Sequence, residues 1–235
     1  MTQPSQKQEN GLLNILINVV LPVMILNQGS KHLGPLITLL LALSFPLIYG
    51  IWDALRRKKI NVFSLLGFIN VSITGGLALI GLGGIWFCIK EAAFPFLIAC
   101  FIFGSAFTKK PFIESFLLNP NLINTDLVEQ KLMERNANTE FHLHLRSSTI
   151  YLSLSFFLSS LINYFLARTV FIPLDPALNS TNRAIILNEQ IAKMTGQSFL
   201  VIMLPSMLVL MGILWYLIHG IKKHTGLKTE EILRT

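Results

Sequence analysis

Residues 61–82 read NVFSLLGFINVSITGGLALIGL and, after Gly83 and Gly84, residues 85–108 read IWFCIKEAAFPFLIACFIFGSAFT. A bilayer core about 30 Å thick requires about 20 apolar helical residues, because lipid offers the backbone polar groups no partner outside the helix. Each of the two runs meets this length. They predict two antiparallel membrane-spanning helices joined by a tight, glycine-rich turn.

The rest of the chain has the same character. Of its 235 residues, 52% are hydrophobic and 13% are charged, and its mean hydropathy is +0.60. This composition excludes a disordered chain, and two cysteines exclude a disulfide-rich scaffold. We therefore predict an all-α, polytopic fold with a single membrane domain over residues 1–235. Its six spans lie at about 11–28, 33–53, 61–82, 85–108, 148–167 and 198–219. Five spans is the alternative, because Lys90 and Glu91 interrupt the fourth run.

Basic residues indicate the orientation of these spans. With six spans, 14 of the 19 Lys and Arg residues fall on one side of the membrane and five on the other. Cytoplasmic loops carry the Lys and Arg excess in membrane proteins. Both termini and the loop 109–146 are therefore expected in the cytoplasm, and the loop 168–197 is expected outside.

Sequence motifs for catalysis or cofactor binding are missing. The chain has no G-x-S-x-G, P-loop, H-E-x-x-H or dinucleotide fingerprint, so an enzyme is not favoured and no cofactor is expected. No metal site is expected either, because His142 and His144 have no carboxylate or cysteine nearby to complete a ligand set. No basic stretch alternates with stacking aromatic residues, which argues against nucleic-acid binding.

Four polar residues within the spans are candidates for a substrate or ion pathway: Asn18, Asn70, Lys90 and Glu91. Lys90 and Glu91 stand five and six residues into the fourth run, and charged residues there are costly unless they pair or face water. Because adjacent helical positions do not face each other, each is expected to need its own partner. For Glu91 the outer-side candidates are Lys31, His32 and Arg168. The alternative is a helix that starts near Ala92, with both charges at the membrane interface.

The polar segments contain further helical signals. Thr125 is a suitable N-cap for a helix to Arg135 with Val128 and Leu132 on one stripe, and residues 184–194 also have a helical pattern. We expect the first helix to lie against the membrane face. A helix that docks another protein is the alternative.

Several short motifs together resemble a known family. They are Asn18-Val19-Val20-Leu21-Pro22, Pro46-Leu47-Ile48-Tyr49, Trp86 with Ile89-Lys90-Glu91, and Lys110-Pro111-Phe112-Ile113-Glu114. Over about residues 14–114 the chain resembles the bacterial inner-membrane proteins grouped with intracellular septation protein A. The resemblance implies a multi-pass inner-membrane protein linked with cell-envelope integrity and division. It carries over no catalytic residue.

Two functions follow as hypotheses. The first is a non-catalytic envelope protein that acts through membrane lipids and other inner-membrane or division proteins, which it meets through residues 109–146. The alternative is a small secondary transporter or lipid flippase. It rests on Lys90 and Glu91 and on the prolines that fall in four different spans, at positions 22, 46, 95 and 205, because proline frees a helical carbonyl.

The predicted orientation is tested by single cysteines placed at Ser5 and at Ser180, with Cys88 and Cys100 replaced. A membrane-impermeant thiol reagent applied outside the cell should label position 180 and leave position 5 unlabelled. The reverse pattern would contradict the orientation derived from the basic residues.

Overall fold

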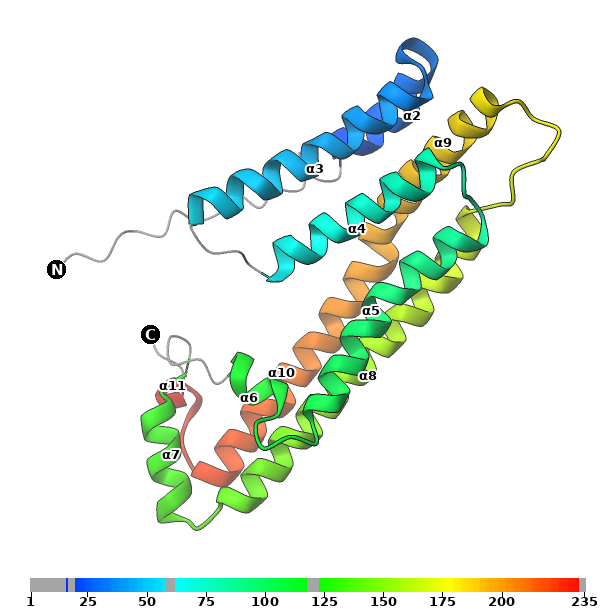
Figure 1. Ribbon diagram of the computed structural model, residues 1–235. Coiled ribbons are helices and arrows are strands. Elements are labelled where there is room, and N and C mark those ends of the chain that lie inside the picture. The colour runs from blue at the N-terminus through cyan, green and yellow to red at the C-terminus, as the bar shows by residue number, and fades with distance from the viewer. Residues whose placement is uncertain (1–15, 17–19, 58–61, 118–122, 233–235) are drawn as a thin grey trace. The chain divides into compact units, whose positions relative to one another are not determined.

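The computed structural model describes residue 16 and residues 20–57, 62–117 and 123–232 (Figure 1). In these residues every regular element is a helix and no strand occurs, so the all-α prediction is confirmed. The elements are α2 (Leu21–Leu33), α3 (Pro35–Arg57), α4 (Val62–Leu79), α5 (Ile85–Ser105), α6 (Phe112–Leu117), α7 (Thr125–Glu134), α8 (Asn138–Val170), α9 (Ser180–Ser198), the π-helical turn η2 (Phe199–Met203), α10 (Leu204–Thr225) and α11 (Thr229–Ile232).

Four helical stretches of the described residues are long and apolar enough to cross a membrane. They are Pro35–Trp52, Ile85–Ser105, Asn138–Val170 and Ser180–Thr225. Ile69–Leu79 is a shorter apolar helix. These stretches indicate a multi-pass membrane protein. Part of the predicted first span, 11–28, lies outside the described residues, namely 11–15 and 17–19.

The chain divides into two compact units. Unit 1 consists of the described residues of Met1–Glu91 together with Asn163–Leu200, and unit 2 consists of those of Ala92–Ile162 together with Val201–Thr235. Each unit therefore joins segments that are far apart in the sequence. The single membrane domain over 1–235 stays a prediction.

In unit 1, α2 and α3 form a helical hairpin around Gly34, whose φ of 78° favours glycine (Figure 1). The two helices approach closely, since a Cβ atom on Gly29 would lie 2.9 Å from Thr38 Cγ2. Helix α9 packs on both, and the buried Asn188 fixes it there. Its Nδ2 donates to Ser30 Oγ at 3.1 Å and to the Pro35 carbonyl at 2.9 Å.

The glycine-rich turn between α4 and α5 is confirmed. Gly81 and Gly84 have φ values of 71° and 55°, a region that other residues rarely adopt. This turn starts α5 at Ile85 and so fixes the depth of Lys90 and Glu91 within the helix.

Unit 2 has its own apolar core, to which the segment between α5 and α8 contributes. Helix α7 lies beside the end of α10 and beside α11 (Figure 1), and the core contains Ile113, Val128, Leu132, Phe141, Leu217 and Ile232, among others. Val128 and Leu132 are 2% and 3% exposed, so the apolar stripe of α7 packs against its own chain. The N-cap of α7 is Asn124, not Thr125 as predicted, because the Asn124 side chain accepts from the Leu127 N–H.

Two predicted loops are shorter than expected. Helix α8 begins at Asn138, inside the predicted loop 109–146, and α9 begins at Ser180, inside the predicted loop 168–197. Hydropathy missed both starts because these helical turns are polar on one face. Their other face is buried: Phe141 and Leu145 pack in unit 2, and Leu187 and Ile191 pack in unit 1.

A tight contact between α8 and α10 within unit 2 gives a stability prediction. A methyl group on Gly220 would overlap the imidazole of His144, whereas nothing lies within 4 Å of a methyl group on Gly212 of the same helix. Overpacking of this kind costs about 1–3 kcal/mol, so Gly220→Ala should lower the Tm of the protein in detergent. The matched control, Gly212→Ala, should not. Adding His144→Ala should restore the Tm of Gly220→Ala. Equal melting of the two alanine variants would contradict this contact.

Candidate functional site: a polar cavity in unit 1

Unit 1 contains a cavity of about 250 Å³ among α2, α3, α4, α5 and α9. Ten of its sixteen wall residues are apolar, and seven of these are buried. Phe87 and Phe171, for example, are 0% and 3% exposed and stack with ring centroids 4.5 Å apart. The polar residues of the wall are Asn70, Thr74, Lys90, Glu91, Thr195 and Ser198. The cavity therefore combines ten apolar wall residues with six polar ones, so it offers both apolar surface and groups that can orient a ligand.

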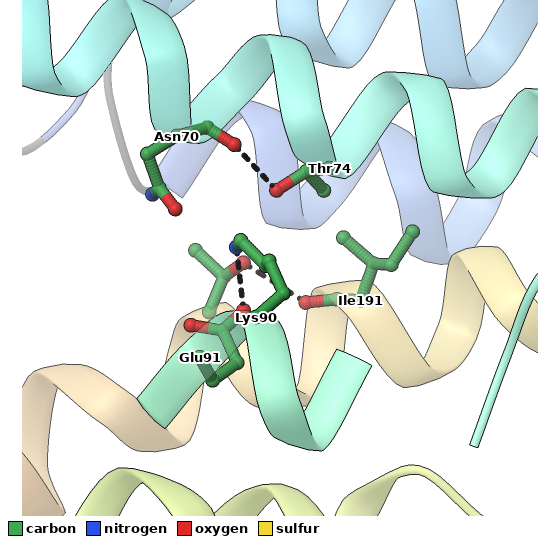
Figure 2. A network of polar contacts seen from close by, with 6 residues as sticks. Asn70, Thr74, Lys90, Glu91 and Ile191 are labelled. Atoms are coloured by element: carbon green, nitrogen blue, oxygen red, sulfur yellow. Dashed lines mark hydrogen bonds and ion pairs between the residues drawn. The ribbon is translucent and has the colours of Figure 1, made fainter. Parts of the chain in front are cut away.

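The two charged residues of the wall pair with each other. Lys90 Nζ lies 2.8 Å from Glu91 Oε1, and the two side chains are 7% and 19% exposed (Figure 2). The expectation of separate partners is wrong, and within the described residues Glu91 forms its ion pair with Lys90 rather than with Lys31, His32 or Arg168. Successive side chains leave a helix about 100° apart, but the four methylene groups of lysine span that angle.

The position of the pair is decided by the start of α5. Because the helix begins at Ile85, Lys90 and Glu91 lie about 8 to 9 Å along its axis from that end. The helix does not start near Ala92, whereas a position of the two charges at the membrane interface stays an alternative prediction. Both charges are enclosed by protein, where an ion is tolerated only if it is paired or hydrated.

Two threonines supply hydroxyl groups from two different helices of the wall. Thr74 Oγ1 of α4 donates to the Asn70 carbonyl at 2.9 Å, and Thr195 Oγ1 of α9 donates to the Ile191 carbonyl at 2.9 Å. Each hydroxyl hydrogen is thus used within its own helix, and the oxygen retains its capacity to accept. Figure 2 shows the side chains of Asn70 and Lys90 directed into the same space between α4 and α5.

The prolines have two different placements. Pro46 and Pro95 lie inside α3 and α5, as predicted, and Pro205 lies inside the continuous helical stretch Ser180–Thr225, at the first turn of α10. Pro22 occupies the first turn of α2. Pro46 has no N–H to donate to the carbonyl of Ala42, and both residues line the cavity. The proline in α3 therefore removes one helical hydrogen bond beside the polar groups.

The structure brings together three of the four predicted site residues. Asn70, Lys90 and Glu91 line one cavity, and Asn18 lies outside the described residues. Three residues of the wall were not predicted from the sequence. Thr195 lies in the predicted outer loop and Ser198 follows it directly. Phe171 follows the predicted fifth span. Only the early start of α9 at Ser180 indicates that Thr195 belongs to a helical wall.

Among the described residues, no group of three or more His, Cys, Asp or Glu side chains is placed to hold a metal ion. Cys88 and Cys100 are both free thiols.

No family model, curated protein or solved structure matches the chain. The resemblance to the septation protein A group stays a prediction that rests on its short motifs.

The ion pair gives a second stability prediction. Glu91→Gln leaves the Lys90 ammonium buried without its counter-charge, and breaking a buried pair in this way costs about 3–5 kcal/mol. We expect a clearly lowered Tm for Glu91→Gln and for Lys90→Met. The double variant should be more stable than either single variant, because it leaves no buried charge unpaired.

Glu114→Gln is the matched control, since Glu114 lies in α6 outside this cavity and should tolerate the change. Strictly additive losses in the double variant would show that Lys90 and Glu91 do not depend on each other.

Proposed function

We propose that this chain is a multi-pass protein of the bacterial inner membrane whose unit 1 cavity lies on the path of a small polar solute or lipid headgroup. The protein would then act as a small secondary transporter or lipid flippase. The observation that carries this proposal is the Lys90–Glu91 pair, which is enclosed by helices yet faces open volume.

Stability alone is a poor explanation for this pair. Replacing a buried ion pair by apolar residues of similar volume is often neutral or stabilising. Charges inside membrane helices commonly mark the path of a substrate or an ion. A cavity of about 250 Å³ also has room for about eight waters at about 30 Å³ each, so its polar groups can be hydrated before a ligand enters.

The proposal includes six spans with both termini in the cytoplasm. Four spans correspond to the long apolar stretches of the described residues. The other two would be α2 with the residues before it, and α4, whose apolar part is Ile69–Leu79.

The non-catalytic envelope function is the second proposal, and it rests on the resemblance and on residues 109–146. The apolar face of α7 is buried in unit 2, so a protein partner would meet its polar face. There Lys131 Nζ lies 2.6 Å from Glu134, and this hydrogen bond is the main cause that lowers the pKa of Glu134 and keeps it ionised. A partner with complementary charge fits this face better than an apolar one.

Access to the cavity distinguishes the two functions. In the chain without native cysteines, Ser198→Cys places a thiol on the cavity wall, and Ala167→Cys places one at a position that is 0% exposed and outside the cavity. We expect 2-aminoethyl methanethiosulfonate, a small water-soluble reagent, to label the thiol at position 198 in proteoliposomes and to leave the thiol at position 167 unlabelled.

If the thiol at position 198 is as unreactive as the one at position 167 from both sides of the membrane, the cavity is closed to solutes and the transport proposal fails. Crosslinking from α7 in cells would then be the direct test of the envelope function.

A further inference from the structure

We propose, on the basis of the proposed solute path, that the cavity binds a small zwitterion. The anionic group of this ligand takes the place of Glu91 at the Lys90 ammonium, and its cationic group takes the place of Lys90 at the Glu91 carboxylate. The ligand thus exchanges one internal ion pair for two pairs with the protein.

The charges of the cavity favour this class over a simple ion. Lys90 and Glu91 are the charged residues among the described residues of the wall, and together they are neutral. A monovalent anion that binds Lys90 would leave Glu91 without its partner in a largely enclosed site, and a monovalent cation would do the same to Lys90. Unpaired buried charge is costly, so either ion incurs a penalty that a zwitterion avoids.

The uncharged groups of the wall include donors for an anionic group and acceptors for a cationic one. An ammonium carries three N–H groups, of which Lys90 directs one at Glu91 in the structure, and the Asn70 amide adds two donors on the same side (Figure 2). These donors suit a carboxylate or phosphate. The hydroxyl oxygens of Thr74 and Thr195 remain acceptors, because their hydrogens are used on helical carbonyls, and they suit the N–H groups of a ligand ammonium.

The volume and the apolar wall limit the rest of the ligand. About 250 Å³ admits a molecule the size of a small amino acid or a phosphoethanolamine group, and the partly buried Leu43, Pro46 and Val71 offer an apolar surface to a short side chain. The shared chemistry is a primary ammonium two or three bonds from an anionic group. The ligand comes either from solution or from a lipid headgroup.

The experiment uses the full chain with Ser198→Cys as its reporter, since Ser198 lines the cavity but makes none of the proposed contacts. The labelling rate with 2-aminoethyl methanethiosulfonate is measured with added alanine, with lactate, which lacks the ammonium, and with alaninamide, which lacks the carboxylate. At ten times its Kd a bound ligand should slow labelling by about tenfold. We expect this protection from alanine, and none from lactate or alaninamide at the same concentration.

A second comparison tests whether the ligand is a lipid headgroup. Labelling is compared in vesicles of phosphatidylethanolamine and of phosphatidylglycerol, without soluble additives. If phosphatidylethanolamine protects the reporter thiol and free alanine in phosphatidylglycerol vesicles does not, the zwitterion is a lipid headgroup. Protection by alanine in both kinds of vesicle identifies a free solute.

Protection should be lost when Lys90→Met and Glu91→Gln are added to the reporter together. Three results would overturn the zwitterion assignment, provided that the reporter thiol still reacts. The first is equal protection by lactate or alaninamide, and the second is alanine protection that persists in this variant. The third is that neither alanine nor phosphatidylethanolamine protects the thiol. If the reporter thiol does not react under any condition, the solute path itself is wrong. The comparison of alanine with its two analogues remains decisive where the double substitution does not fold.

Discussion

A peptide group or hydroxyl in a bilayer has no water to bond, and this constraint governs how polar side chains are used throughout the described chain. Many hydroxyl groups donate to a carbonyl three or four residues earlier in their own helix. Those that reach the fourth residue at distances between 2.6 and 2.9 Å are Thr38, Thr74, Ser148, Thr149, Thr195 and Thr225. Since these groups are satisfied locally, each helix can pack by shape and few polar contacts are needed between helices.

The polar contacts that do join helices therefore have definite roles. Asn188 holds α9 against both α2 and α3, and Ser160 Oγ of α8 donates to the Ala92 carbonyl of α5 at 2.8 Å. A hydrogen bond between membrane helices contributes about 0.6 kcal/mol on average. Such bonds fix the register of neighbouring helices more than they add to stability. In unit 1 the hydrogen bonds of Asn188 hold α9 in the position in which Thr195 lines the cavity.

The sequence was sufficient for the features that depend on local composition. Apolar length predicts the helical fold, and the glycines at 81 and 84 predict the turn that sets the depth of Lys90 and Glu91. It was insufficient where packing decides. The starts of α8 and α9 depend on Phe141 and Ile191, which are buried against residues distant in the chain. Likewise, the rule that adjacent helical residues do not face each other describes the directions of their Cβ atoms. It does not describe the reach of a lysine inside an enclosed cavity.

An ion pair between consecutive residues has a consequence for how the protein enters the membrane. On the scale of translocon insertion a charged residue costs about 2.5–3.5 kcal/mol at the centre of a span, and Lys90 and Glu91 lie between that centre and the start of α5. Pairs that bridge two helices cannot form until the second helix arrives, so each helix must carry its charge into lipid alone. Lys90 and Glu91 are synthesised one after the other on α5, and their contact requires only that helix. The fourth predicted span can therefore leave the translocon already neutralised, before α9 has been translated.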